Sequence, residues 1–127
     1  MLEWKGWKAI ARDVLLMWIL SGISGFLIGF VLAMTGRSSL FMAAICLSNF
    51  ICAVIVFFIS GCLIRENRWE HLVKVAFFTW LTSLVNFLLG FTSFSNWLLS
   101  IFAVLIFMAI GGGLSSLFVK AASVSPE

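Results

Sequence analysis

The sequence predicts an all-α integral membrane protein with four transmembrane helices. It is 63% hydrophobic and only 10% charged, which lies far outside the composition of soluble domains. The charged residues gather in short clusters, and the uncharged runs between the clusters are long enough to cross a bilayer. One domain of 127 residues could not bury so much apolar surface within itself. We therefore expect residues 1–127 to form one membrane domain of two helical hairpins.

The N-terminal segment, residues 1–13, is expected to lie at the membrane surface. Tryptophan and apolar residues recur there at helical spacing, with basic residues on the neighbouring face. The segment is either a short helix at the headgroup level or a basic, tryptophan-anchored flank. No small-x-small cleavage site follows the next apolar run, so we expect the segment to be retained rather than removed as a signal peptide. Asp13, beside Arg12, is interpreted as a flank residue.

The first span, about residues 14–35, carries a stripe of small residues. Ser21, Gly25, Gly29 and Ala33 recur every four residues, so they share one side of a helix. Small residues let a second helix approach closely within a bilayer. The stripe therefore predicts a packing face, with the bulky apolar side chains turned to lipid.

The second span, about 39–64, and the third, about 72–91, each contain an asparagine. Asn49 and Asn86 lie at comparable depth, about 20 Å above the cytoplasmic ends of their spans at 1.5 Å per residue. An amide in hydrocarbon needs a partner, so the two are expected either to bond across a helix interface or to line a polar path. Thr79 and Ser83 extend the polar side of the third span. That helix is expected to begin within the polar cluster at 65–71.

The fourth span, about 97–119, contains the run Gly111, Gly112 and Gly113, and a polar tail follows at 120–127. Gly112 and Ser21 lie at similar depth, about 10 Å inside the cytoplasmic face. The glycines are therefore expected to pack against the small stripe of the first span, or, in the alternative, to interrupt the helix at a substrate site.

The basic residues predict the orientation of the spans. Of eight Lys and Arg residues, only Arg37 falls on the side opposite the chain ends and the 65–74 segment. Basic flanks favour the cytoplasm, so both termini are expected inside, with Trp97 at the outer interface. A bacterial inner membrane is the expected location.

No catalytic, cofactor-binding or metal-binding pattern is present in the sequence. His71 with Glu66 and Glu70 is interpreted as a solvated helix start, because the spacing matches no metal-ligand motif. No soluble region is large enough to bind nucleic acid. The favoured function is a non-enzymatic subunit, either a homo-oligomer or an accessory part of a membrane complex. The alternative is a channel or facilitator for a neutral or anionic solute, lined by Asn49, Asn86, Thr79 and Ser83.

Overall fold

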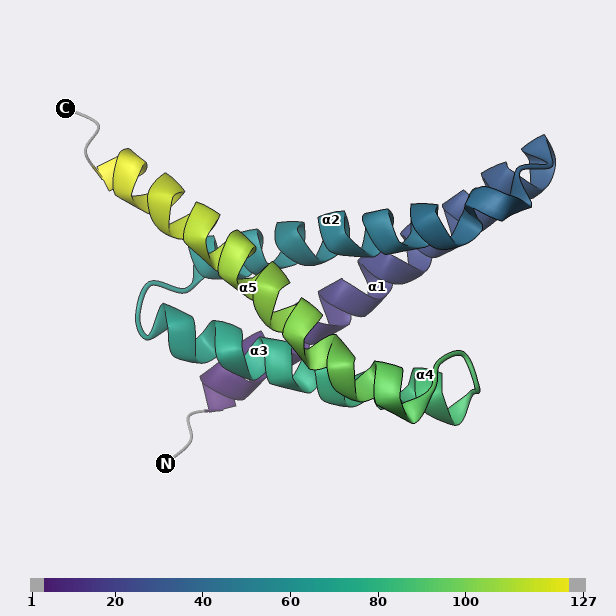
Figure 1. The fold of residues 1–127 in the computed structure, drawn as a ribbon. Coiled ribbons are helices and arrows are strands. Elements are labelled where there is room, and N and C mark those ends of the chain that lie inside the picture. The colour runs from purple at the N-terminus through teal and green to yellow at the C-terminus, as the bar shows by residue number, and fades with distance from the viewer. Residues whose placement is uncertain (1–3, 124–127) are drawn as a thin grey trace.

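The structure, a computed structural model, describes residues 4–123, and all regular structure in that range is helical. The elements are α1 (Trp4–Thr35), the 3-10 helix η1 (Ser38–Leu40), α2 (Phe41–Leu63), α3 (Arg68–Thr82), α4 (Leu84–Leu88) and α5 (Phe94–Ser123) (Figure 1). Four stretches are long and apolar enough to cross a membrane: Gly6–Thr35, Ser38–Leu63, Arg68–Leu88 and Phe94–Ser123. The predicted class, all-α with four membrane-length helices, is confirmed. Residues 1–3 of the predicted N-terminal segment and residues 124–127 of the predicted polar tail lie outside the described range.

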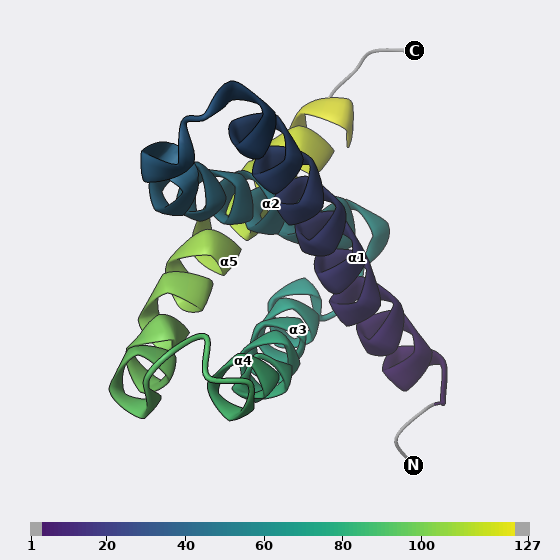
Figure 2. The same ribbon diagram turned by 90° about the vertical axis from the view of Figure 1, so that its right-hand side faces the viewer.

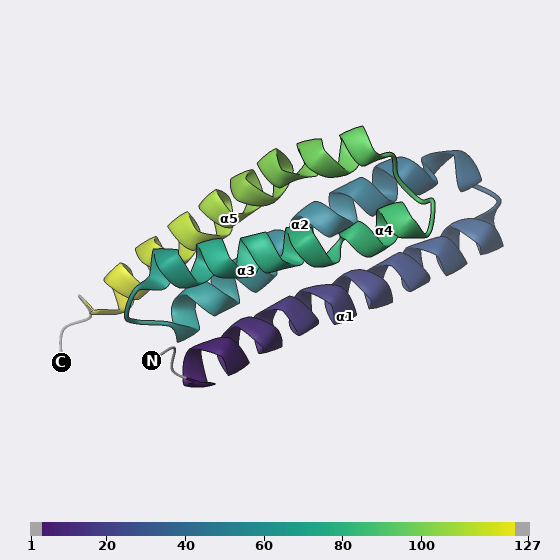
Figure 3. The ribbon, with the colours of Figure 1, turned by 90° about the horizontal axis from the view of Figure 1, so that it is seen from below.

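The helices run back and forth along one direction, so the connections gather at two ends (Figure 3). One end, called here the terminal end, holds the start of α1, the connection between α2 and α3, and the end of α5. The other, called the hairpin end, holds the α1–α2 and α4–α5 connections. The orientation of these two ends relative to the cytoplasm stays a prediction.

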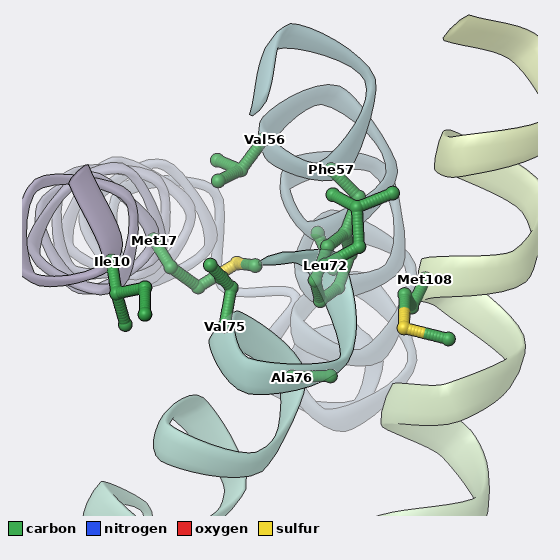
Figure 4. Packing of buried hydrophobic residues seen from close by; sticks show 9 residues of the cluster. Ile10, Met17, Val56, Phe57, Leu72, Val75, Ala76 and Met108 are labelled. Atoms are coloured by element: carbon green, nitrogen blue, oxygen red, sulfur yellow. The ribbon is translucent and has the colours of Figure 1, made fainter. Parts of the chain in front are cut away.

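Helices α2 and α3 each contact all the other long helices, and the most extensive contact in the bundle is the one between α2 and α5. Among the described residues, no Cα atom of α1 lies within 8 Å of one in α5. The buried side chains come from all four long helices and point toward one another (Figure 4). The main ones are Ile10, Met17, Val56, Phe57, Leu72, Val75 and Met108. Away from this core, α1 and α2 diverge from α4 and the start of α5 toward the hairpin end (Figures 1 and 2).

Helix α1 is continuous over 32 residues and includes positions 4–13 of the N-terminal segment. Its buried side chains near the terminal end are Ile10, Asp13 and Met17, whereas Trp7 and Ala11 are exposed. The reason is tertiary: α2 and α3 cover the side of α1 that carries Asp13.

The helix of the third span begins at Arg68, inside the polar cluster at 65–71 as predicted, and it is interrupted near its end. Asn67, in the left-handed conformation with φ 49°, precedes the first residue of α3. The helix ends at Thr82, and the short α4 ends at Leu88, a few residues before the predicted boundary. At the junction, the Ser83 hydroxyl donates a 2.6 Å hydrogen bond to the Trp80 carbonyl. Such local side-chain bonds compete with regular helix geometry.

Candidate functional site

The most unusual group in the bundle is the carboxylate of Asp13, which is 1% exposed. Arg12 donates to Oδ1 through Nε at 2.7 Å, and its Nη2 also lies 2.7 Å from that oxygen. Ser60 Oγ donates to Oδ2 at 2.5 Å, and His71 Nε2 lies 2.8 Å from the same oxygen. We call Arg12, Asp13, Ser60 and His71 the carboxylate cluster.

Three helices position the carboxylate cluster at the terminal end. Asp13 lies on α1 between the buried residues Ile10 and Met17. Ser60 lies in the last turn of α2, and His71 in the first turn of α3, where its backbone N–H donates to the Asn67 carbonyl. The cluster therefore joins three helices through one acid, next to the hydrophobic core.

Within the carboxylate cluster, Asp13 pairs with the guanidinium of Arg12. The Arg12 side chain is 50% exposed, so one guanidinium both pairs with Asp13 and reaches the surface. Ser60 and His71 bond the same carboxylate oxygen, and no hydrogen bond joins them within residues 4–123. The arrangement consequently lacks the contact by which a histidine activates a serine nucleophile. What the geometry supplies is a buried carboxylate that is paired with Arg12 of its own helix and joined by hydrogen bonds to α2 and α3.

Sequence reasoning missed the carboxylate cluster. It interpreted Asp13 as a flank residue and placed His71 among solvated groups with Glu66 and Glu70. In the structure His71 is buried and the two glutamates are exposed. Glu70 instead accepts a 2.5 Å hydrogen bond from Lys74, its neighbour four residues on. A signal for Asp13 existed, since it shares one helical side with Ile10 and Met17.

The small stripe of α1 faces α2. A Cβ atom added to Gly25 would lie 3.7 Å from Ile45 Cδ1, and one added to Gly29 would lie 3.5 Å from Phe41 Cε2. Ser21 is half-buried on the same helix. These are ordinary van der Waals distances, so α1 and α2 are in contact here but an added Cβ atom would not clash.

The α5 glycines pack differently from the expectation that they meet the first span. A Cβ atom on Gly111 would lie 2.6 Å from Phe57 Cβ of α2, and one on Gly112 would lie 2.8 Å from Leu72 Cδ1 of α3. A Cβ atom on Gly113 would meet nothing within 4 Å. Helices α2 and α3, rather than α1, are therefore the partners of the glycine run, because both contact α5 while α1 does not.

The polar residues predicted to meet in mid-membrane are only partly brought together. Ser83 and Asn86 line one shallow pocket with Asn96 and Ser100, at the hairpin end. Asn49 is exposed on α2, and among the described residues no Cα atom of α2 lies within 8 Å of one in α4. The expected contact between Asn49 and Asn86 is therefore not formed.

Two further polar side chains lie near the end of α3, Thr79 on α3 itself and Trp97 on α5. Thr79 Oγ1 is buried and has no hydrogen-bond partner within the described part of the chain. Trp97 is buried, and its ring stacks on that of Trp80 with centroids 4.3 Å apart. Its Nε1 also donates to Ser83 Oγ at 3.1 Å. These contacts join α3 to α5.

Comparisons with protein-family models, with curated proteins and with solved structures found no match to this chain. Its function is therefore inferred from its own contacts, burial and charges.

Proposed function

We propose that the protein is a non-enzymatic subunit of an oligomeric membrane assembly, and that its partner is a second copy of the same chain. The observation that supports this proposal is Asn49, an amide exposed on a membrane-length helix. A polar side chain within hydrocarbon is costly unless it is hydrogen-bonded. An exposed amide there therefore favours contact with another polypeptide.

The position of Asn49 along α2 places it well inside the span. At 1.5 Å per residue it lies about 12 Å from the first residue of α2 and about 21 Å from the last. It precedes the buried Ala53 by one helical turn, and so projects from nearly the same side of α2. Toward the hairpin end, α4 and the start of α5 diverge from α2 (Figure 2), and Asn49 is exposed.

A second copy is the partner that best fits an asparagine. An amide carries both a donor and an acceptor, so two Asn49 side chains related by a two-fold axis can bond each other. Cys46, about one turn from Asn49 on α2, is exposed and small. Small side chains beside a polar one allow helix backbones to approach closely in lipid.

The channel alternative needs Asn49 and Asn86 to border one path. The two residues lie on helices that do not contact each other, and Asn86 faces a pocket shared with the start of α5. Assembly is supported better, because it requires only that Asn49 is exposed and does not require Asn49 and Asn86 to lie together. Solute flux that is lost on substituting Asn49, with the oligomer unchanged, would instead favour the channel.

Single cysteines on α2 test the proposed assembly in native membranes. Cys46, Cys52 and Cys62 are first changed to Ser, and Asn49→Cys is then compared with Leu47→Cys. Leu47 is a matched control, since it is exposed at nearly the same depth and projects from the opposite side of α2. We expect oxidation to cross-link position 49 into dimers and to leave position 47 monomeric.

The contribution of the amide is measured separately. Asn49→Leu should weaken self-association about 3- to 30-fold, as expected for an interhelical hydrogen bond of about 0.6–2 kcal/mol. Equal cross-linking at positions 47 and 49, or unchanged association of Asn49→Leu, would contradict the proposal.

A further inference from the structure

A second polar feature lies at the terminal end, in a groove between the start of α3 and the last turns of α5. We call it the basic groove. It is lined by Cys62, Arg65, Arg68, Phe118, Val119 and Ser123. None of these residues belongs to the carboxylate cluster or to the exposed side of α2 around Asn49.

The two arginines give the basic groove its charge, and one of them is held in place. Arg68 is half-buried, donating from Nη1 to Ser116 Oγ at 2.9 Å and from Nε to the Ile64 carbonyl at 3.5 Å. Arg65 is exposed. Within residues 4–123 neither arginine forms an ion pair with a carboxylate, and neither does the neighbouring Glu66. The groove therefore carries a net positive charge in the part of the chain described.

The remaining lining of the basic groove is mostly apolar. Phe118 and Val119 come from α5, and Cys62 comes from the last turn of α2. The groove thus lies where membrane-length helices end and polar connections begin. Guanidinium groups bind phosphate oxygens in a fixed, often bidentate geometry. Apolar side chains directly beside them suit the glycerol and upper acyl region of a lipid.

We propose that the basic groove binds the phosphate headgroup of an anionic phospholipid, with Arg65 and Arg68 on the phosphate and Phe118 beside the acyl chain. Basic pockets between transmembrane helices are suited to such headgroups. A free phosphate ion would use only the arginines, so the apolar lining favours the lipid. The site is independent of the oligomer proposed above.

Binding of phosphatidylglycerol to the detergent-solubilised full chain tests the site, with phosphatidylcholine as the neutral comparison. The variant is Arg65→Gln, because Arg65 makes no side-chain hydrogen bond or ion pair within residues 4–123 whose loss would disturb the fold. The matched control is Lys8→Gln, which removes the same charge from the exposed surface of α1 near the same end. Circular dichroism verifies the helical fold of both.

We expect Arg65→Gln to weaken phosphatidylglycerol binding about 5-fold, the effect of about 1 kcal/mol for one basic residue near an anionic lipid. Lys8→Gln should change the affinity less than 2-fold, and phosphatidylcholine should bind weakly to all three proteins. Equal losses in the two variants would show diffuse attraction and overturn the proposal. Unchanged binding of phosphatidylglycerol by Arg65→Gln would also overturn the proposal. The same holds if inorganic phosphate raises the thermal unfolding midpoint of the protein as much as the lipid does.

Discussion

At the scale of single residues, the carboxylate of Asp13 is the group whose surroundings matter most. It is buried, and its two oxygens are shared by Arg12, Ser60 and His71. A buried carboxylate adds little net stability over apolar packing, but its removal leaves the buried Ser60 and His71 without their acceptor. We therefore expect a single replacement in the carboxylate cluster to lower the free energy of unfolding far more than a combined replacement of its members.

Replacing Asp13 by Leu should lower the free energy of unfolding by about 3–5 kcal/mol, because Ser60 and His71 lose their acceptor. Reversible unfolding of the purified protein in mixed micelles measures this change. The combined variant Asp13→Leu, Ser60→Ala, His71→Leu should recover most of the loss. Glu70→Gln breaks only an exposed ion pair with Lys74 and should stay close to wild type. A loss in Glu70→Gln equal to that in Asp13→Leu would contradict this account.

At the scale of elements, the contact between α2 and α5 depends on glycine at two crossing points. A Cβ atom on Gly111 would lie 2.6 Å from Phe57 Cβ and 2.8 Å from the Val54 carbonyl oxygen. One on Gly61 would lie 2.8 Å from Ser115 Cβ. Neither Phe57 nor the α2 backbone can yield easily, since Phe57 is completely buried. The two helices can therefore lie this close only without side chains at these positions.

Gly111→Ala should destabilise the protein by about 1–3 kcal/mol through overpacking of the contact with α2. Its thermal unfolding midpoint in detergent is the measurement. Gly113→Ala is the matched control, two residues along the same helix, where an added Cβ atom meets nothing within 4 Å. It should be neutral, so a drop in its midpoint as large as that of Gly111→Ala would refute the proposed crossing.

At the scale of the whole molecule, the bundle is packed at the terminal end and divergent at the hairpin end (Figure 1). The carboxylate cluster and most of the buried core occupy the first region. The basic residues are also biased toward it, since Arg37 is the single Lys or Arg at the hairpin end. The positive-inside rule therefore predicts that the packed end faces the cytoplasm.

Labelling of single cysteines in intact cells checks this orientation. In the background without native cysteines, a membrane-impermeant maleimide should label Ser38→Cys and should leave Glu66→Cys unlabelled until the cells are permeabilised. Both positions are exposed, so accessibility to the reagent depends on the side of the membrane. Labelling of Glu66→Cys before permeabilisation would show that the orientation is inverted.

The class of the protein and its four spans could be predicted because they depend on local properties of the chain. Long uncharged runs must enter lipid, and in lipid the backbone must satisfy its own hydrogen bonds within helices. The start of α3 at Arg68, within the polar cluster at 65–71, follows an equally local signal. In the structure, Gly25 and Gly29 of the small stripe lie beside Ile45 and Phe41.

The choice of partners was decided only by the tertiary structure. Asp13 meets His71 across 58 positions of sequence, and the glycines of α5 meet α2 and α3 instead of α1. In a membrane protein, lipid-facing and helix-facing surfaces are both apolar, so hydropathy does not distinguish them. Which helix surfaces pack together depends on side-chain shape and on which side chains bond the buried Asp13. Neither property can be read from the sequence.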